Sequence, residues 1–411
     1  MLSAYRALDL TDQNGFLCGK ILGDLGVDVI KIEKPGGDPA RNIGPFYQDI
    51  PDPEKSLFWF AFNTSKRGIT LDIESEDGKS MFRRLVEGAD FVIESFRPGY
   101  LDSLGLGYPS LSQINPRLIM GSITPYGQTG PHRDYKASDL TSMAMSGMMY
   151  LQGDTDRPPI RFGFPQAYLH GAAQTAVGML IALYHRESSG RGQYVDTSIQ
   201  ESVVMATLNA VPFWEVGKSI LRRAGNFRVG LSGGVRQRQN WPCKDGYVSF
   251  IMMGGGHGAK TNKGLVEWMK EKGVEDKFLY EIDWDNFDMG KTTQDIHDRM
   301  EKIVGEFFMK HTKAEIHSQA VKRGMMLFPV NNMKDIVSDP QLKSRNFWQE
   351  VEHPELGTKI TYPGSFVKTS GLPCYIRHRA PLIGEHNREI LEGELVLSKN
   401  DMIVLKQAEV I

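Results

Sequence analysis

Residues 5–32 read YRALDLTDQNGFLCGKILGDLGVDVIKI, and the hydrophobic pattern of this stretch decides the fold class. Tyr5–Leu10 is an apolar segment of strand length, and Phe16–Leu25 places apolar residues at helical spacing. Gly26 ends the predicted helix, and Val27–Ile32 follows as a second apolar strand. A strand, a helix and a strand in this order are typical of a βαβ unit with parallel strands.

The turn between the first strand and the helix is where a doubly wound domain binds a dinucleotide. Here the turn reads TDQNG over Thr11–Gly15, and it lacks the GxGxxG pattern that lets the backbone approach a pyrophosphate. The stretch therefore predicts a nucleotide-binding type of architecture and argues against NAD as the ligand.

The alternation of strands and helices continues through the N-terminal half of the chain. A helix predicted from Ser75 is followed by strands at Phe91–Glu94 and Leu118–Thr124, so this half is expected to form a doubly wound α/β domain. Lys66 and Arg67 stand just before another predicted strand, where they fit either a solvated surface pair or a phosphate contact. The apolar stripe of the helix consists of Met81, Phe82, Leu85, Val86 and Ala89.

A second prominent stretch, Gly163–Ser202, reads GFPQAYLHGAAQTAVGMLIALYHRESSGRGQYVDTSIQES. A glycine-punctuated turn at Gly190–Gln193 divides it into a long predicted helix and a second helix that begins at Val195–Ser198. The positions that we expect to be buried on the long helix recur at helical spacing. They are Ala173, Ala176, Val177, Leu180, Ile181 and Tyr184.

The chain changes character after about Val216, where several arginines and glycines predict a linker. A predicted strand, Tyr247–Met253, ends in the glycine-rich run Gly254–Gly258, and charged helical segments follow from Asn262 to about Lys322. Strand and loop patterns return from Met326. Core candidates in this region are Trp268, Leu279, Phe307 and Phe308.

Composition limits the class of protein. A chain of 411 residues favours two domains, and 40% hydrophobic with 24% charged residues is typical of a soluble globular protein. The 48 Lys and Arg nearly balance the 50 Asp and Glu, so no overall charge attracts nucleic acid or an anionic membrane. Cys18, Cys243 and Cys374 match neither a disulfide framework nor a metal site. No export or membrane-spanning segment is recognisable, and we expect a cytoplasmic protein.

Six strings that follow one another along the chain resemble the family III CoA-transferases, which include formyl-CoA:oxalate CoA-transferase, carnitine CoA-transferase and the α-methylacyl-CoA racemases. The resemblance covers about Leu8 to His386. The strings are LGVDVIKIEKPGGD, NTSKRGITLD, ESFRPGYLDSLGLGY, INPRLIMGSITPYGQTGP, ALYHRESSGRGQYVDTSIQES and RAPLIGEH.

The resemblance implies a Rossmann-like large α/β domain formed from both chain ends, a smaller α+β domain and an interlocked dimer. It implies residues 1–215 for the first part of the large domain, 216–329 for a linker and the small domain, and 330–411 for the return and completion of the large domain. No tightly bound cofactor or metal is implied. Coenzyme A or an acyl-CoA is expected as a substrate if the site is retained.

The resemblance also implies where coenzyme A lies, namely across the first turn, the KR turn and the ESF turn. Phe96 would flank adenine, and the lysines would meet phosphates as point charges, although a solvated role fits Lys34 and Lys136 as well. Carried over by position, the coenzyme A residues are Gln13, Asn14, Lys34 in place of an arginine, Lys66, Ser95, Phe96 and Lys136.

The family's nucleophile is an aspartate, which forms a mixed anhydride and then an aspartyl-CoA thioester. Its position, four residues before Gly171, holds Ala167 in this chain, and a methyl group forms no anhydride. His170 points elsewhere than Ala167 on a helix start and fits a packed or capping role better. The resemblance makes Gly254, Gly255 and Gly256, in the run to Gly258, a candidate loop that covers the site, although a flexible turn also fits.

The racemase branch of the family is excluded separately. It needs the same aspartate and a histidine that would match Ser138, just before Asp139, because moving a proton across an α-carbon takes two acid/base groups. Phe162, Phe164 and Trp214 fit either an apolar acyl pocket or the core.

Three interpretations follow. The first is the non-catalytic subunit of a heteromeric CoA-transferase, in an interlocked heterodimer or heterotetramer with a catalytic paralog. The benzylsuccinate CoA-transferases of anaerobic toluene breakdown are its expected system, with succinyl-CoA as donor and an aromatic succinate as acceptor. The second is a homodimeric CoA-transferase whose aspartate was replaced by alanine. The third is a CoA-binding scaffold without chemistry.

Overall fold

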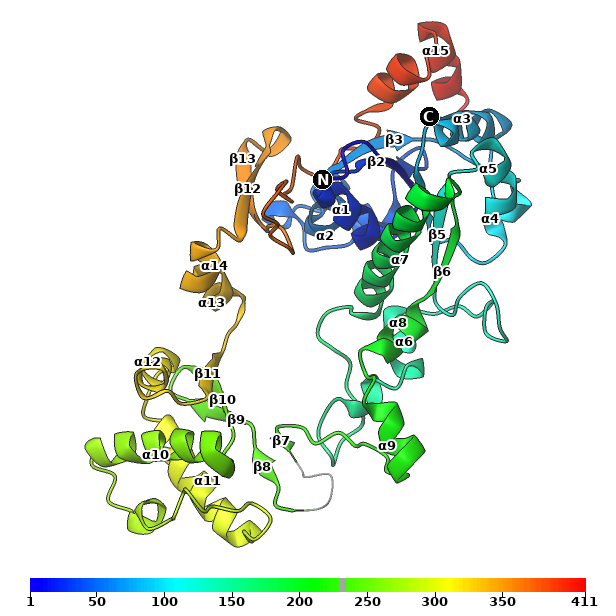
Figure 1. The fold of residues 1–411 in the computed structure, drawn as a ribbon. Helices are drawn as coiled ribbons and strands as arrows, with labels where there is room; N and C mark the ends of the chain where they lie inside the picture. The colour runs from blue at the N-terminus through cyan, green and yellow to red at the C-terminus, as the bar shows by residue number, and fades with distance from the viewer. Residues whose placement is uncertain (229–233) are drawn as a thin grey trace. The chain divides into compact units, whose positions relative to one another are not determined.

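In the computed structural model, which describes residues 1–228 and 234–411, six parallel strands form one sheet in the order β3-β2-β1-β4-β5-β6 (Figure 1). This is the strand order of a doubly wound dinucleotide-binding domain, so the predicted α/β class with a parallel sheet is confirmed. The strands are β1 (Arg6–Asp9), β2 (Asp28–Glu33), β3 (Lys66–Thr70), β4 (Phe91–Glu94), β5 (Ile119–Thr124) and β6 (Tyr194–Ser198).

The described residues divide into two compact units, each of which is described by itself. The sheet belongs to the first unit, which draws on both ends of the chain. The first unit comprises residues 1–149, 161–220 and 344–411, and the second comprises 150–160 and 221–343.

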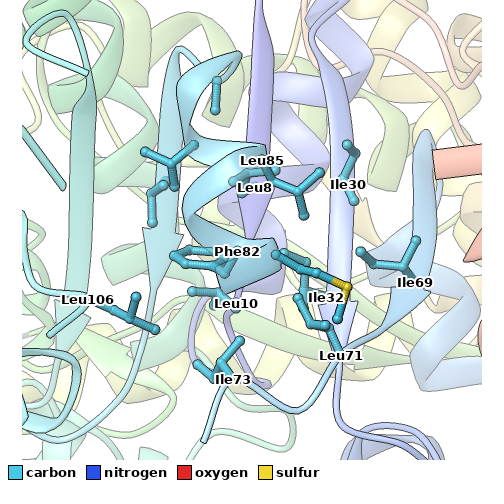
Figure 2. Close-up of a cluster of buried hydrophobic side chains, with 14 of the residues drawn as sticks. Leu8, Leu10, Ile30, Ile32, Ile69, Leu71, Ile73, Phe82, Leu85 and Leu106 are labelled. Carbon is cyan, nitrogen blue, oxygen red and sulfur yellow. The ribbon is translucent and has the colours of Figure 1, made fainter. Parts of the chain in front are cut away.

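Helices cover both faces of the parallel sheet, which explains why its strands read as continuous apolar runs. On one face, Leu8, Ile30 and Ile32 pack against Phe82 and Leu85 (Figure 2). On the other face, the strands pack against α1 (Phe16–Leu25) and α7 (Ala167–Ser189). The first face is covered by α3 (Glu76–Glu87), α4 (Tyr100–Ser103) and α5 (Tyr108–Ile114).

The βαβ prediction at the N-terminus is confirmed. Helix α1 has the predicted bounds, and Gly26 ends it with φ +119°, a left-handed conformation that favours glycine. Helix α3 begins after Ser75, whose side chain accepts the N–H of Gly78.

Helix α7 forms as predicted, but the face that it buries differs from the prediction. Val177, Ile181 and Tyr184 are 51%, 64% and 84% exposed. The buried stripe is the smaller-residue face, where Ala176 and Met179 pack on the sheet. Gly121 of β5 permits this approach, because a Cβ there would lie 2.7 Å from the Met179 Sδ. The prediction is therefore confirmed for Ala176 and for partly buried Leu180, and it is wrong for Val177, Ile181 and Tyr184.

The second half of the same stretch is also different from the prediction. Tyr194–Ser198 forms the edge strand β6, parallel to β5, and helix α8 (Ile199–Met205) begins only after it. A half-exposed edge strand with polar residues lacks the apolar run by which the buried strands are recognised. Ser198 then caps α8 by accepting the N–H of Glu201.

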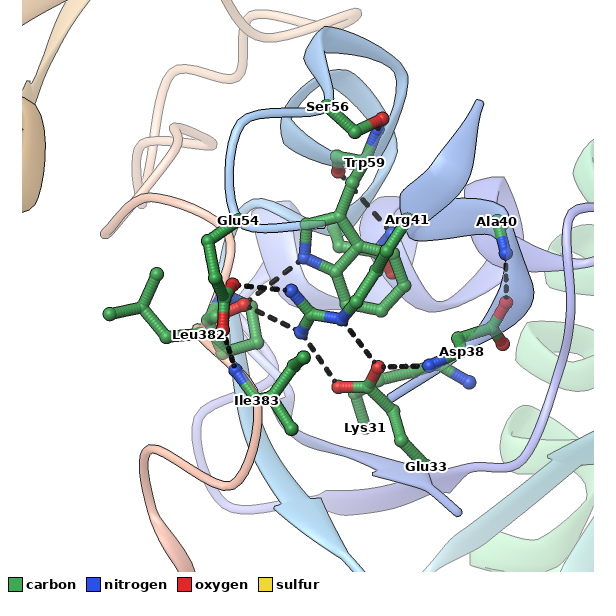
Figure 3. A network of polar contacts seen from close by, with 12 residues as sticks. Lys31, Glu33, Asp38, Ala40, Arg41, Glu54, Ser56, Trp59, Leu382 and Ile383 are labelled. Carbon is green, nitrogen blue, oxygen red and sulfur yellow. Dashed lines mark hydrogen bonds and ion pairs between the residues drawn. The ribbon is translucent and has the colours of Figure 1, made fainter. Parts of the chain in front are cut away.

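The C-terminal segment packs back onto the N-terminal sheet. The Arg41 guanidinium is buried, pairs with Glu33 and Glu54 and donates to the Pro381 carbonyl at 3.0 Å (Figure 3). Trp59 lies 3.8 Å from the Arg41 guanidinium and also donates to Pro381. This network joins the string RAPLIGEH to the start of the chain. The C-terminal helices are η6 (Arg388–Glu394) and α15 (Lys399–Gln407).

The second unit has its own core. A three-stranded antiparallel sheet packs against three helices, and the predicted core residues Trp268, Leu279, Phe307 and Phe308 are at most 3% exposed. The strands are β9 (Asn240–Cys243), β10 (Gly246–Phe250) and β11 (Leu327–Val330), and the helices are α10 (Gly255–Glu271), α11 (Gln294–Phe308) and α12 (Lys313–Arg323), with the turn η4 (Lys277–Tyr280).

Shorter elements complete the described chain. They are η1 (Pro39–Asn42), η2 (Tyr47–Asp49), α2 (Leu57–Asn63), α6 (Asp139–Met145), η3 (Met149–Leu151), α9 (Ala210–Gly217), β7 (Phe227–Arg228), β8 (Gln237–Arg238), α13 (Met333–Ser338), α14 (Pro340–Ser344), β12 (Trp348–His353), η5 (Pro354–Leu356) and β13 (Thr358–Pro363).

Candidate functional site

The turns after β1 and β4 meet where the strand order of the sheet reverses. Gln13 and Asn14 follow β1, and Ser95 and Phe96 follow β4, so four of the predicted coenzyme A residues border this switch point. Ligands of open α/β sheets bind in the crevice outside such a point, beyond the carboxyl ends of the strands. The four residues therefore lie where open α/β sheets generally bind their ligands.

Asp12, which we did not predict, ties the two turns together. Its N–H donates to the Ser95 Oγ at 2.8 Å, and the Ser95 hydroxyl donates back to the Asp12 Oδ1 at 2.8 Å. Asp12 also accepts from the backbone N–H of Asn14 at 2.9 Å. An aspartate at the start of a turn, such as Asp12 before Gln13 and Asn14, is the sequence pattern that predicts an Asx turn. The hydrogen bonds of Asp12 fix the positions of Asn14 and Ser95.

Lys66 differs from the prediction, because its side chain is buried rather than available to a ligand. It lies within β3 rather than before a strand, and its exposed fraction is 0%. Its ammonium donates to the Asp9 Oδ2 at 2.8 Å, to the Phe16 carbonyl at 2.9 Å and to the Asn63 Oδ1 at 2.9 Å. Lys66 holds the start of α1 through its hydrogen bond to the Phe16 carbonyl and does not face solvent.

Lys31 makes a second buried contact beneath the first turn. Its ammonium donates to the Thr11 carbonyl and lies 4.0 Å from the Asp9 Oδ1. Burial alone raises the pKa of Asp9, but the charges of Lys66 and Lys31 outweigh it and hold this pKa below its ordinary value. Asp9 is therefore ionised at neutral pH, and two lysines hold the turn that carries Gln13 and Asn14.

Lys34 is exposed and ion-paired, an environment that fits both the solvated role and the predicted contact with coenzyme A. Its side chain is 59% exposed, and its ammonium lies 2.9 Å from the Glu74 Oε1. The Tyr100 hydroxyl donates to the same carboxylate, and the ring of Tyr100 packs 4.7 Å from the ring of Phe96. Lys34 and Phe96 are thus linked through Glu74 and Tyr100, although they come from different turns.

Lys136 lies exposed in the loop between β5 and α6. The neighbouring ring of Tyr135 packs on Tyr126 and His132 at centroid distances of 6.2 and 4.7 Å. The role of Lys136 in binding coenzyme A stays a prediction.

Ala167 is the first residue of α7, and its exposed fraction is 0%. A carboxylate from another helix lies at this helix terminus. The Asp139 Oδ1, at the start of α6, accepts the backbone N–H groups of Gln166 at 2.8 Å and Ala167 at 2.7 Å. It acts as a cap for α7, which has no side-chain cap of its own at Gln166.

Ser138 and His170 are the two other residues considered near Ala167, and the hydrogen bonds of Ser138 give it a structural role. Ser138, at the position of the racemase histidine, caps α6 and accepts the N–H of Thr141. His170 is half-buried within α7, and its backbone N–H donates to the Gln166 carbonyl as part of the helix. Ser138 therefore does not supply the second acid/base group of a racemase, and the packed or capping role of the His170 side chain stays a prediction.

A small apolar cavity of about 30 Å³ lies beside the start of α7. Gln13, Phe164 and Tyr168 line it, so the first turn and the segment around Ala167 face one cavity. Of the other predicted acyl-pocket residues, Phe162 packs against the core of this unit, and Trp214 is 48% exposed on α9.

The glycine-rich run belongs to the second unit and mostly begins a helix. Gly254 precedes α10, and Gly255 and Gly256 lie in its first turn, so the run is a helix start rather than a loop. A Cβ at Gly254 would lie 2.4 Å from the Phe287 carbonyl oxygen, so close packing against Phe287 requires glycine at this position. A covering role over the site stays a prediction.

Residues 1–228 and 234–411 contain neither a metal-site cluster nor a membrane-spanning helix. No group of three or more His, Cys, Asp or Glu side chains in these ranges has the arrangement of a metal site. Within the same ranges, no helix is long and apolar enough to cross a membrane.

Sequence comparison gives a consistent picture. The model of CoA-transferase family III matches residues 2–387. The succinyl-CoA:(R)-benzylsuccinate CoA-transferase subunit BbsE of Thauera aromatica is 38% identical over 394 residues, which cover 95% of this chain and 93% of that protein. The succinyl-CoA–L-malate CoA-transferase beta subunit of Chloroflexus aurantiacus is 30% identical and covers 96% of this chain and 94% of its own length.

Structural comparison agrees with the sequence. A CAIB/BAIF family protein from Brucella suis superimposes with a TM-score of 0.79 at 27% identity, and the match covers 95% of this chain and 98% of that one. The likeness extends over both units of the described chain.

Proposed function

Because the chain belongs to CoA-transferase family III, we propose that it is the non-catalytic subunit of a heteromeric CoA-transferase. The enzyme moves CoA from a donor such as succinyl-CoA to a carboxylic acid such as an aromatic succinate. A paralogous subunit that retains the family's aspartate carries out the chemistry.

The observation that carries this proposal is the side chain at residue 167. The position is a buried helix start occupied by alanine, so it offers no carboxylate to a thioester. The nearby Asp139 carboxylate is held by two backbone N–H groups as the cap of α7. We propose that Asp139 serves α7 as its cap and does not replace the missing nucleophile.

The family reaction requires that missing carboxylate at every step. An aspartate attacks the donor thioester and the C–S bond breaks. CoA thiolate departs, and a mixed anhydride of the aspartate and the donor acid remains. The thiolate then attacks the aspartyl carbonyl, which releases the donor acid and gives an aspartyl-CoA thioester. The acceptor carboxylate displaces the thiolate to form a new anhydride, and the thiolate takes the acceptor acyl group to regenerate the aspartate. None of these steps can begin at Ala167.

We propose that the turns after β1 and β4 keep a surface for coenzyme A. Gln13, Asn14, Ser95 and Phe96 border the switch point, and Lys34, which follows β2, is linked to Phe96 through Glu74 and Tyr100. A phosphate would compete with Glu74 for the Lys34 ammonium. Lys66 would act through the turn that it supports rather than by contact with the ligand.

The donor and acceptor classes rest on the relatives. One relative uses succinyl-CoA and (R)-benzylsuccinate, and others use succinyl-CoA with D-citramalate or L-malate. Succinyl-CoA is common to these names, which supports it as the donor. The acceptor is proposed from the relative with the highest identity among these three, at 38% against 30%.

A protein partner is supported by the apolar side chains that the first unit exposes. Val177, Ile181 and Tyr184 form one exposed stripe on α7, and Val216 is 88% exposed at the end of α9. Exposed apolar groups that gather on one helix face mark interaction sites. Two of the relatives are named as subunits, and we propose that the paralog covers this stripe in an interlocked heteromer.

Covalent trapping tests the assignment of roles. The co-purified heteromer is incubated with succinyl-CoA, quenched with hydroxylamine and analysed by intact-protein mass spectrometry. Hydroxylamine converts an aspartyl thioester or anhydride to a hydroxamate, and we expect this mass increase on the paralog alone. A hydroxamate on the present chain would refute the proposal.

An Ala167→Asp variant separates the proposal from a homodimeric enzyme. A homodimer would regain transfer when the aspartate is restored, whereas we expect the lone variant chain to stay inactive because its partner is missing. Calorimetry with the paralog separates the proposal from a scaffold, since a scaffold would bind coenzyme A without forming a stable heteromer.

A further inference from the structure

Strand β3 is the outermost strand on one side of the parallel sheet, and a short segment from the C-terminal end of the chain covers its outer edge. Residues 381–387 form this segment, which we call the edge strap. The His386 N–H donates to the Gly68 carbonyl at 2.9 Å, so the strap meets β3 as a neighbouring strand would. A Cβ at Gly68 would lie 2.8 Å from the Pro381 side chain, so glycine permits this close approach.

Two side chains of the edge strap accept the hydrogen bonds that backbone carbonyls accept within a sheet. The Gly68 N–H donates to the His386 Nδ1 at 3.1 Å. The Thr70 N–H donates to the Asn387 Oδ1 at 2.8 Å, and the Asn387 amide donates to the Thr70 Oγ1 at 2.7 Å. Closure at Gly68 therefore depends on an imidazole lone pair, whereas closure at Thr70 depends on an amide, which does not titrate.

Both ends of the edge strap are anchored independently of His386. At one end, the Pro381 carbonyl accepts from the buried Arg41 guanidinium at 3.0 Å (Figure 3). Beyond the other end, Ile390 is fully buried in the core that covers the sheet. An opening confined to residues 384–387 would therefore leave both anchors in place and would uncover only this part of the β3 edge.

The half-buried imidazole of His386 lines a cavity of about 450 Å³, through which solvent protons reach it. Strand β12 and the segment before the edge strap supply the other walls of this cavity. The charged and titratable side chains around His386 are Glu350, Glu352, Arg377, His378, Arg379 and Glu385 in the cavity, and, beside β3, Arg67 with its partners Asp28, Glu389 and Glu394.

The surroundings of His386 single it out among the titratable groups of this cavity. Arg379 and Glu385 pair with each other at 2.8 Å, so their charges largely offset one another. Burial lowers the pKa of His378, and charge on His386 lowers it further. The ring of His378 contacts the Arg379 carbonyl, whereas the ring of His386 accepts from β3. Protonation of His386 is therefore the event that acts directly on the strand edge.

We propose that His386 is a pH-sensitive latch for the edge strap. The neutral ring carries its proton on Nε2 and accepts the Gly68 N–H at Nδ1. A second proton, taken from solvent, occupies Nδ1, which removes the acceptor and sets two N–H groups against each other. Residues 384–387 then open, and the edge of β3 at Gly68 is uncovered. Histidine gains this charge between pH 5 and 8, so the edge is closed at neutral pH and opens in mild acid. The proposal does not depend on the transferase role.

Amide hydrogen exchange of the full chain tests the latch, followed residue by residue by NMR and expressed as protection factors at pH 7.5 and pH 5.5. An imidazole in water has a pKa of about 6.5, so the open form gains a proton across this range that the latched form excludes. We expect the Gly68 protection factor to fall about tenfold. Leu71, whose N–H donates to the Glu33 carbonyl at 2.7 Å, is the internal control and should keep its protection.

Three variants assign the pH dependence to one ring. His386→Asn places an amide oxygen near the position of Nδ1, and Gly68 should stay protected at both pH values because this acceptor does not titrate. His386→Phe removes the acceptor, and the protection of Gly68 should be low at both. His378→Asn removes the other imidazole of the cavity and should leave the tenfold change intact.

Three results would overturn the proposal. They are a Gly68 protection factor that does not change with pH in the parent chain, an undiminished change in His386→Asn, and loss of the change in His378→Asn. A parallel fall at Leu71 would also overturn it, because the acid would then loosen the whole strand and not its edge.

Discussion

Lys34 and Lys66 illustrate how the environment of one residue type decides its role. Lys34 follows β2 and projects an exposed ammonium toward Glu74, whereas Lys66 lies inside β3 and pairs with buried Asp9. A buried lysine of this kind contributes to stability through its partners, and an exposed lysine near a switch point can meet a phosphate.

Matched substitutions of the two lysines are expected to separate stability from binding. Lys66→Met leaves the buried Asp9 carboxylate without its nearer cation, with only Lys31 at 4.0 Å, and we expect a loss of about 3–5 kcal/mol in the free energy of unfolding. Lys34→Met should cost less than about 1 kcal/mol, because its pair is exposed, and should weaken coenzyme A binding. Urea unfolding and calorimetry measure the two effects. Equal stability of the two variants would contradict the burial of Lys66.

Glu94 predicts a specific pH dependence of stability. Burial raises its pKa from 4.5 to about 7, so between these values the folded chain holds a proton that the unfolded chain has released. This contribution is complete below about pH 4.5 and is lost as the pH rises through 7. Glu94→Gln should therefore differ from the parent by less than about 1 kcal/mol at pH 5 and be more stable at pH 8, by about 3 kcal/mol at most.

The melting temperatures of the two proteins at pH 5 and pH 8 measure this difference. Glu76→Gln is the control, because its carboxylate is 86% exposed and should give no gain at either pH. A parent chain and a Glu94→Gln variant with parallel pH profiles would show that Glu94 is ionised at neutral pH.

At the scale of single residues, the sequence identified Ala167 because a family motif marks its position, but it did not identify Asp12. The Asp12–Ser95 hydrogen bonds join turns that are 83 residues apart, and no local pattern reports such a contact. The burial of Lys66 was missed for a related reason, since its partner Asp9 is 57 residues away.

Helix α7 shows the limits of periodicity at the scale of the element. The predictions for β4 and α1 agree with the structure, because the apolar residues of these elements pack into the core. Helix α7 is apolar on two sides, so the pattern predicted the helix without selecting the side that packs on the sheet. The edge strand β6 is half polar and was read as a helix start.

The exposed side of α7 carries a prediction about assembly. Ile181→Glu places a charge on the stripe that we assign to the partner, and it should dissociate the heteromer without lowering the stability of the isolated chain, because Ile181 is 64% exposed. Val321→Glu, at a 69% exposed position on α12 in the second unit, is the control. Light scattering of the co-purified proteins measures the mass, and an intact heteromer with Ile181→Glu would place the interface elsewhere.

At the scale of the whole molecule, the first unit is closed by contacts between the two ends of the chain. Arg41 joins Glu33 and Glu54 to the Pro381 carbonyl, 340 residues away (Figure 3). The family resemblance implied that both ends build one domain, but sequence patterns alone could not name the residues that join them. The fold class was predictable because strands and helices alternate, whereas these closing contacts depend on tertiary structure.

Substitution of Arg41 tests that closure. Arg41→Met leaves the buried Glu33 carboxylate without its cation, and we expect a loss of about 3–5 kcal/mol in the free energy of unfolding. Arg388→Met, whose side chain is 79% exposed on η6, is the matched control. Hydrogen exchange should also rise around Pro381 and Ile383, and unchanged protection there would mean that other contacts hold the C-terminal segment.

The chain belongs to CoA-transferase family III, and we propose that its partner subunit, and not this chain, carries the nucleophile. The most direct measurement is the rate of CoA transfer from succinyl-CoA to an aromatic succinate by the purified chain alone and by the same chain co-expressed with its aspartate-bearing paralog. We predict background activity for the lone chain and robust transfer by the heteromer. Transfer by the lone chain above background would contradict the account.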